Sequence, residues 1–429
     1  MYLDWIVQIG SYELYKAAQV SDAWSFLAVD NNADAFGKIL VQALPIAISR
    51  IMQQQPSGNH DMVGPRQAQG VFAKLLNKEI LGEMGRLLFS LLNAFSLSGY
   101  HIRLANNLPD SALDKYGRLA CSLEHVTLTD EVPSDTSQMI YLFDEEDRTI
   151  GSRAWRKKVQ VRFDVFSSYW FARPILMPYP VHPVHAGADL RDRLHKYRLA
   201  EKKMRIFFSG DREGYSRNRI RYPKAKLPRL DAINAILEEM GDEALLVRGE
   251  ESLRSICATG YVDKCLIMDQ DKFRIDTADW LSTLATSDFF LCPPGFVMPM
   301  CHNAVEAMAV GAIPIINYPE WFDPRLEHLE NCVEFDDRVD LLGKLNEVLR
   351  MDNEQITRMR QRVIEYYDTY LAPESFIRRI ESSERERVIV LMITDANVSK
   401  NASKLNSRSV LIRGTSAPEI GGWLGRFRH

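Results

Sequence analysis

The sequence is poor in cysteine and has no long hydrophobic run. Its six cysteines are scattered over 429 residues without a Cys-x-x-Cys pair, which argues against a disulfide framework and against a zinc site. The longest apolar candidate, 39–48, is broken by Pro45 and is too short to cross a bilayer. No segment has the pattern of a signal peptide. We therefore expect a cytoplasmic protein whose thiols are reduced and buried.

Several well-known catalytic motifs are also missing. The chain contains no Gly-x-Ser-x-Gly elbow, no P-loop and no Gly-x-Gly-x-x-Gly stretch, so hydrolase, ATPase and dehydrogenase functions lack support. An excess of positive charge is missing as well, because 57 acidic residues outweigh 53 basic ones and the formal net charge is −4. That balance disfavours a globally basic nucleic-acid binder, and we expect no nucleic-acid partner.

What is present is the composition of a soluble globular chain, with 46% hydrophobic and 26% charged residues. From Gly82 onward, short apolar strands alternate with amphipathic helices, which predicts parallel sheets covered by helices on both faces. The fold class we expect is α/β, with two Rossmann-like, doubly wound domains facing a central cleft. The expected parts are a helical N-terminal part of the first domain (1–80), the Rossmann-like remainder of that domain (81–195), a second Rossmann-like domain (196–386) and a tail with a strand pair (387–429).

The pattern also predicts individual elements. Expected strands are 101–104, 139–143, 159–163, 205–208, 244–247, 265–268, 289–292 and 313–316, with a late pair at 388–393 and 410–412. Expected helices are 86–95, 229–240, 276–286, 338–351 and 354–370, together with one that starts near Pro299 or Met300.

The most informative stretch runs from Asp288 to Tyr318. A buried strand enters the loop Pro293-Pro294-Gly295, a helix follows, and Gly311 ends that helix before the next strand. Backbone N–H groups at such a helix start attract anions such as phosphate. Glu306 lies within about two turns of that start and can accept hydrogen bonds from a ribose diol. An ordinary strand–helix–strand unit remains the alternative.

A second stretch follows the strand 205–208. Between Lys196 and Arg229 there are twelve Lys or Arg against three Asp or Glu, a local charge of +9 that leaves −13 for the remainder. Glycines let the backbone approach a ligand, and arginines make forked hydrogen bonds to a diphosphate. A solvated basic loop or an RNA-binding patch is the alternative, although few aromatic residues are available for stacking. The candidates for small-anion binding here are Gly210, Arg212, Tyr215, Arg217 and Arg219.

Together the two stretches resemble a known family. The strand and glycine "RIFFSG", followed by arginines, and the later "SDFFLCPPGF…CHNAVEAMAVGAIPIINY" are similar to exostosin-like glycosyltransferases of the GT-B fold. The resemblance covers roughly 205–319. Cys301-His302-Asn303 stand where the family usually has an arginine, which is compatible with a divergent bacterial branch.

The resemblance implies an inverting transfer of a sugar from a nucleotide-activated donor, with no bound metal. It also implies that 1–195 form the acceptor-binding domain and 196–386 the nucleotide-sugar donor-binding domain. In that interpretation Glu306 binds the ribose, the arginines neutralise the phosphates, and the loop 294–303 cradles the donor. The donor-binding residues it implies in this loop and helix are Pro294, Gly295, His302, Asn303 and Glu306.

Other polar residues offer further candidates. Asp269-Gln270-Asp271 matches the Asp-x-Asp metal motif of other glycosyltransferases, but so short a match arises easily by chance, and we expect no metal site. Sugar transfer needs a general base in the acceptor half. Asp144 directly follows an apolar strand, and His182 lies with His185 in a proline-rich domain junction, so Asp144 and His182 are the catalytic candidates.

The function we expect is a nucleotide-sugar glycosyltransferase acting on a glycan, glycolipid or protein. The alternatives are a non-catalytic binder of RNA or an anionic polymer through 196–229, and a nucleotide-sugar epimerase. The first eighty residues can serve as an interface to a partner, a second subunit or a membrane surface.

We predict that Glu306→Ala sharply weakens nucleotide binding, because it removes the proposed ribose acceptor. Calorimetric titration of the variant with a panel of nucleoside mono- and diphosphates tests this, and nucleotides that bind the native protein raise its melting temperature. Wild-type-like affinity would remove the donor-site assignment.

Overall fold

The computed structural model describes residues 70–105, 114–166, 174–211, 226–269, 273–295 and 298–401. The expected helical region before Gly70, the tail after Asn401 and most of the arginine-rich loop lie outside these residues. None of the helices in the described ranges is long and apolar enough to span a membrane.

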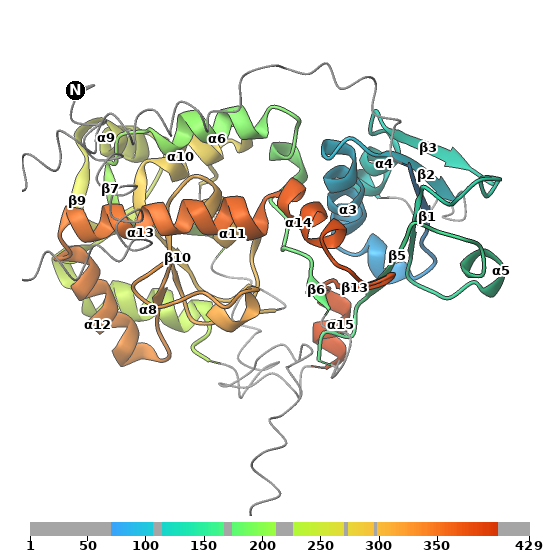
Figure 1. Ribbon diagram of the computed structural model, residues 1–429. Helices are drawn as coiled ribbons and strands as arrows, with labels where there is room; N and C mark the ends of the chain where they lie inside the picture. The colour runs from blue at the N-terminus through green and yellow to red at the C-terminus, as the bar shows by residue number, and fades with distance from the viewer. Residues whose placement is uncertain are drawn as a thin grey trace, which may run out of the picture. The chain divides into compact units, whose positions relative to one another are not determined.

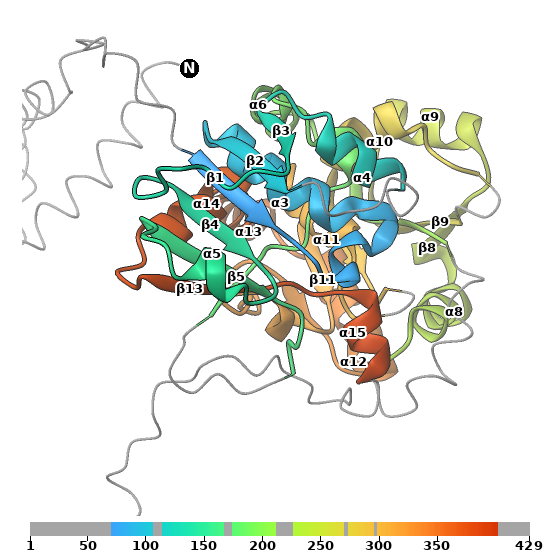
Figure 2. The same cartoon turned by 90° about the vertical axis from the view of Figure 1, so that its right-hand side faces the viewer.

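The first sheet has seven strands, all parallel to their neighbours, in the order β3-β2-β1-β4-β5-β13-β6 (Figures 1 and 2). Its strands are β1 (Gly70–Lys74), β2 (His101–Ala105), β3 (Val126–Thr129), β4 (Ile140–Phe143), β5 (Lys157–Arg162), β6 (Ile175–Leu176) and β13 (Arg387–Leu391). The helices associated with it are α3 (Arg86–Leu97), α4 (Lys115–Cys121), α5 (Arg148–Gly151), α14 (Pro373–Glu381) and α15 (Asp395–Lys400).

Side chains alternate between the two faces of this sheet, as the period of two in a strand requires. Val71 and Leu142 belong to the main hydrophobic core, on the side of α3. Phe72 and Tyr141 point to the opposite face, where they form a separate aromatic cluster with Trp155. Both faces of the central strands are therefore buried.

The second sheet has six parallel strands in the order β12-β11-β10-β7-β9-β8. Its strands are β7 (Met204–Gly210), β8 (Ala244–Val247), β9 (Tyr261–Asp269), β10 (Ser287–Cys292), β11 (Ile313–Ile316) and β12 (Val333–Glu334). The helices around it are α6 (Leu190–Arg198), α8 (Arg229–Glu239), α9 (Glu250–Thr259), α10 (Thr277–Ala285), α11 (His302–Ala309), α12 (Arg338–Leu349) and α13 (Asn353–Tyr366). The α/β fold with two parallel, helix-covered sheets is thus confirmed.

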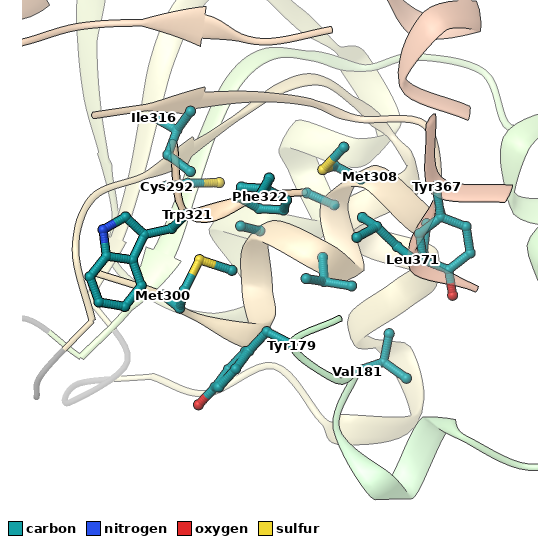
Figure 3. Close-up of a cluster of buried hydrophobic side chains, with 14 of the residues drawn as sticks. Tyr179, Val181, Cys292, Met300, Met308, Ile316, Trp321, Phe322, Tyr367 and Leu371 are labelled. Atoms are coloured by element: carbon teal, nitrogen blue, oxygen red, sulfur yellow. The ribbon is translucent and has the colours of Figure 1, made fainter. Parts of the chain in front are cut away.

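The chain passes between the two sheets twice. The first connection is the linker 177–189, and the second is the π-helical turn Tyr367–Leu371, which leads into α14. Figure 3 shows Tyr179 and Val181 of the linker beside Met300 and Leu371 in the main core, with the Tyr179 hydroxyl directed away from the cluster. A cavity of only about 10 Å³ lies between Tyr179, Met300 and Leu371, so the linker is closely packed against the second half.

After the second crossing, α14 packs beside α3, and β13 inserts between β5 and β6 (Figure 1). Lys157 secures this return: its ammonium donates to the carbonyl oxygens of Ile380, Glu381 and Ser383 at 2.9, 2.9 and 2.7 Å. A cation at a helix C-terminus satisfies carbonyl groups that have no partner within the helix.

Four described strands, β1, β3, β6 and β12, have no counterpart among the expected ones, and the expected late pair also differs. Gly70–Lys74 forms the central strand β1, although it falls in the region predicted to be helical, because a five-residue apolar segment shows no helical period. The late strand lies at Arg387–Leu391, and it pairs with β5 and β6. Its predicted partner at 410–412 lies outside the described residues.

Gly85 precedes α3 in the left-handed conformation (φ 80°), and a Cβ there would lie 2.2 Å from the backbone nitrogen of Gly117. Gly99 has nearly the same φ (81°), but a Cβ there would meet no described atom within 4 Å. We predict that both Gly→Ala changes lower the free energy of unfolding by about 1–2 kcal/mol, because alanine is strained in the left-handed conformation. Gly85→Ala should cost about 1–3 kcal/mol more, because it also forces α3 and α4 apart. Urea unfolding of the two variants measures the difference, and equal losses would contradict it.

Candidate functional site

The strand order of each sheet indicates where a ligand would bind, namely at the carboxyl ends of one pair of neighbouring strands. In each sheet the chain order reverses beside the first strand, between β1 and β4 in one and between β7 and β10 in the other. Ligand sites of open parallel sheets lie just beyond such switch points. The loops to inspect are therefore those after β1, β4, β7 and β10.

The loop after β10 is held in place by Arg229. This buried guanidinium donates from Nε to the carbonyl oxygen of Pro294 at 3.0 Å and from Nη2 to that of Pro293 at 3.4 Å. A Cβ on Gly295 would lie 2.6 Å from the carbonyl oxygen of Met300, so only glycine fits this turn. The loop leads into α11, which begins at His302, slightly after the predicted start near Pro299 or Met300.

Asn303, in the first turn of α11, connects this loop to the end of β7. Its Nδ2 donates to the carbonyl oxygen of Ser209 at 3.3 Å. Gly210, the last residue of β7, lies beside Arg229, whose Nη1 would be 3.0 Å from a Cβ at that position. The structure therefore brings Gly210, Pro294, Gly295 and Asn303 together.

The loop after β1 has an unusual backbone. Glu83, Met84 and Gly85 have φ values of 55°, 60° and 80° in succession. Two consecutive non-glycine residues in this region are strained, and such strain concentrates at functional sites. The loop ends at Arg86, the first residue of α3.

Arg86 and His302 join the two halves. The Arg86 Nη1 donates to Nδ1 of His302 at 3.3 Å. Burial, followed by the charges of Arg86 and Arg229, lowers the pKa of His302 to about 3, so its imidazole is neutral. Because Nδ1 is the acceptor, we assign the ring proton to Nε2, which makes Nε2 a donor.

The polar groups gathered here are mainly donors. Arg86 is 9% exposed, and its Nε has no hydrogen-bond partner among the described residues. Neither α3 nor α11 has an acidic residue in its first turn or a capping side chain in the described part of the chain. Two helix N-termini, a guanidinium and an imidazole N–H thus meet at the switch points, an arrangement that suits an anion.

Glu306 is completely buried, with 0% exposure, one turn beyond His302. Its Oε1 accepts the backbone N–H of His182 at 2.8 Å, and its Oε2 accepts the indole N–H of Trp280 at 2.6 Å. The carboxylate therefore ties the linker to α10 and α11. The ribose contact predicted for Glu306 stays a prediction.

His182 has both ring nitrogens engaged. Its Nδ1 accepts the backbone N–H of Val184 at 3.3 Å, and its Nε2 lies 3.0 Å from the hydroxyl of Tyr116. Burial, together with the nearby Arg86 and His302, lowers the pKa of His182 to about 4. These contacts give His182 a positioning role in the linker, and its predicted catalytic role is not tested by them.

Asp144 supports the loop after β1. Its carboxylate, 8% exposed, accepts the backbone N–H groups of Leu76, Asn77 and Glu145, each at 2.8 Å. These bonds fix the first turn of the loop that leads to Glu83. A catalytic role for Asp144 likewise stays a prediction.

Glu83 was not a candidate in the sequence, because β1 was not expected. The Tyr179 hydroxyl donates to both of its carboxylate oxygens at 2.9 Å, and Arg86 Nη1 lies 3.6 Å away. Burial, with a smaller contribution from the charge of Asp395, raises the pKa of Glu83 to about 7, against the opposing effects of Tyr179 and Arg86. The glycines Gly82 and Gly85 just before an amphipathic helix are the sequence signal that could have identified this loop.

Some predicted residues cannot be placed. Arg212, Tyr215, Arg217 and Arg219 lie outside the described residues, as do two residues of the Asp269-Gln270-Asp271 motif. Within the described ranges, no group of three or more His, Cys, Asp or Glu side chains could hold a metal ion.

We predict that Glu306→Gln lowers the free energy of unfolding by about 1–3 kcal/mol, because the new NH₂ group faces a buried N–H donor and leaves it without an acceptor. Glu354→Gln is the matched control, since Glu354 is an exposed partner of Arg358 and such pairs contribute at most about 1 kcal/mol. Equal effects in urea unfolding would contradict a structural role for Glu306, and nucleotide titration of the same variant separates this role from ribose binding.

No protein-family model and no curated protein matches the chain. The resemblance to exostosin-like enzymes therefore stays a prediction.

Comparison with solved structures gives distant similarity to glycosyltransferases. Anabaena HepE in complex with UDP is 11% identical, with a TM-score of 0.39, over 73% of this chain and 98% of that one. A glycosyltransferase from Rickettsia africae is 8% identical, with a TM-score of 0.40, over 79% and 99% of the two chains. The T4 phage BGT in complex with UDP-glucose is 10% identical, with a TM-score of 0.32, over 73% and 99%.

Proposed function

We propose that the protein is a glycosyltransferase that moves a sugar from a nucleotide-activated donor to a hydroxyl group of a glycan, glycolipid or protein, with inversion and without a metal. The observation that carries the proposal is the contact between Arg86 and His302. This contact joins the switch points of two parallel sheets and brings hydrogen-bond donors of the two halves close together.

A diphosphate fits this chemistry. A nucleoside diphosphate leaving group has only acceptor oxygens, and its negative charge grows as the bond to the sugar breaks. The α11 N-terminus, the α3 N-terminus, Arg86 Nε and the Nε2–H of His302 supply donors without a competing carboxylate in either first helical turn. These groups are fixed before the reaction, so they stabilise the developing charge without having to reorganise.

The same groups explain why no metal is required in the proposal. A divalent cation serves many sugar transferases by neutralising the diphosphate. Here the permanently charged guanidinium of Arg86 and two helix dipoles supply positive potential at that position. The arginines of 212–219 and the loop 294–303, including Gly295 and Asn303, complete the proposed donor site.

The two halves have separate tasks in the proposal. The loop after β10 and α11 hold the donor, and the loop after β1 faces it from the first sheet. UDP, the nucleotide in the HepE complex, is the first ligand to test, followed by GDP, CDP and CMP.

We predict that UDP or another of these nucleotides raises the melting temperature of the full chain in the presence of EDTA. Arg86→Gln should weaken that affinity about tenfold to hundredfold, because a charge-assisted hydrogen bond contributes about 1.5–3 kcal/mol. Calorimetric titration gives both affinities.

The control is Arg358→Gln, which removes an exposed guanidinium of α13 that pairs with Glu354. It should bind nucleotide like the wild type. If no nucleotide binds, or if binding requires Mn²⁺ or Mg²⁺, the proposed function or its metal-free form is overturned.

A further inference from the structure

We infer that Glu83 is the general base that takes the proton from the acceptor hydroxyl. This inference rests on the proposed function and deepens it, because it names the residue of the first half that acts on the acceptor.

The first support is position. Glu83 lies in the loop after β1, at the switch point of the first sheet, three residues before Arg86. Arg86 in turn contacts His302 at the start of α11. A base in this loop therefore stands next to the proposed diphosphate site but belongs to the opposite half, which is where the acceptor must approach.

The second support is the backbone. Glu83 and Met84 both have positive φ, at 55° and 60°, although neither is glycine. The cost of two such residues persists only where the surroundings fix them. Asp144 fixes the start of the loop through three backbone N–H groups, and Gly85 fixes its end through the close approach to Gly117. The strained backbone thus fixes the direction of the Glu83 side chain.

The third support is the environment of the carboxylate. Three charged or titratable groups act on it from three elements: Tyr179 of the linker, Arg86 of α3 and Asp395 of α15. Tyr179 donates one hydroxyl proton to the two oxygens, which leaves lone pairs for an acceptor hydroxyl. Burial raises the pKa of Glu83 to about 7, so near neutral pH the group can both accept and release a proton.

Other carboxylates and imidazoles at the site are less suited. Asp144 has its oxygens occupied by backbone N–H groups, and Glu306 is fully buried between two donors. The ring nitrogens of His182 are both engaged, and its pKa is lowered to about 4. The Glu83 side chain, in contrast, keeps 10% of its surface exposed.

The chemical step balances as follows. The acceptor oxygen forms a bond to the anomeric carbon while the bond from that carbon to the diphosphate oxygen breaks. The hydroxyl proton passes to the Glu83 carboxylate, and the nucleoside diphosphate leaves with the electron pair of the broken bond. Glu83 then releases the proton to solvent, which restores the base.

The first experiment measures release of UDP from UDP-glucose, with water as the acceptor, for wild type, Glu83→Gln and the control Glu131→Gln. Glu131 is an exposed residue of the turn after β3. If GDP or CDP stabilises the protein instead of UDP, a sugar conjugate of that nucleotide is used as the substrate in place of UDP-glucose. We expect Glu83→Gln to reduce kcat about 100-fold, to leave the nucleotide-induced rise in melting temperature unchanged, and to abolish the fall in rate below about pH 7. Asp395→Asn should shift that fall to lower pH, because the negative charge that raises the pKa of Glu83 is gone.

The second experiment needs no donor. A carboxyl group whose folded-state pKa is raised costs the native protein stability only above its unfolded-state pKa. The melting temperature of Glu83→Gln should therefore exceed that of wild type by a margin that grows between about pH 4.5 and 7 and then stays constant. Glu131→Gln should show no such trend.

The outcomes separate the two proposals. If a nucleotide binds and Glu83→Gln keeps the wild-type rate and pH profile, Glu83 is not the base, and the proposed function stands. A stability margin that does not change with pH also overturns the assignment of Glu83. If no nucleotide sugar is bound or cleaved by the wild type, the proposed function fails and the base assignment fails with it.

Discussion

The arrangement of the site depends on one buried carboxylate. Glu306 accepts the backbone N–H of His182 and the indole N–H of Trp280, and so fixes the linker against α10 and α11. The same linker carries Tyr179 to Glu83 and His182 to Tyr116 of α4. Removing either donor would leave a buried negative charge poorly satisfied, which proteins tolerate only at large cost. The relation between the first turn of α11 and the loop after β1 therefore follows from a few hydrogen bonds around a single side chain.

Burial affects the ionisable groups of the site in opposite directions. It keeps His182 and His302 uncharged, with pKa values lowered to about 4 and about 3, and it raises the pKa of Glu83 to about 7. Desolvation disfavours the charged form in each case. The fixed positive charges near the proposed phosphate position are consequently guanidinium groups, those of Arg86 and Arg229, while the imidazoles act as neutral donors or spacers. This division allows one desolvated region to hold an anion and still contain a titratable carboxyl group.

Much of the fold was predictable from the sequence, and the geometry of the candidate site was not. Strands such as Ser287–Cys292 and Ile313–Ile316 lie close to where the sequence predicted them, because a strand buried on both faces is an apolar run that leaves a local signal. β1 begins with glycine, which is depleted in strands, and it falls in the region predicted to be helical, so its strand pattern was not recognised. The pKa of Glu83 depends on its burial and on Tyr179 and Asp395, two residues that lie far away in the chain. Local patterns do not contain such contacts, nor do they show that the Asp144 carboxylate accepts three backbone N–H groups.

The insertion of β13 between β5 and β6 has a consequence for synthesis of the chain on the ribosome. Strands β7 to β12 form a sheet from one continuous segment, so that half can assemble as soon as it has emerged. The first sheet has a gap beside β5 until Arg387–Leu391 is made, and among the described strands β6 pairs only with β13. The first sheet begins earlier in the chain than the second. The ribosome nevertheless completes the second sheet before it completes the first. Until then, the open edge of β5 exposes unpaired backbone groups, the kind of surface that chaperones protect from aggregation.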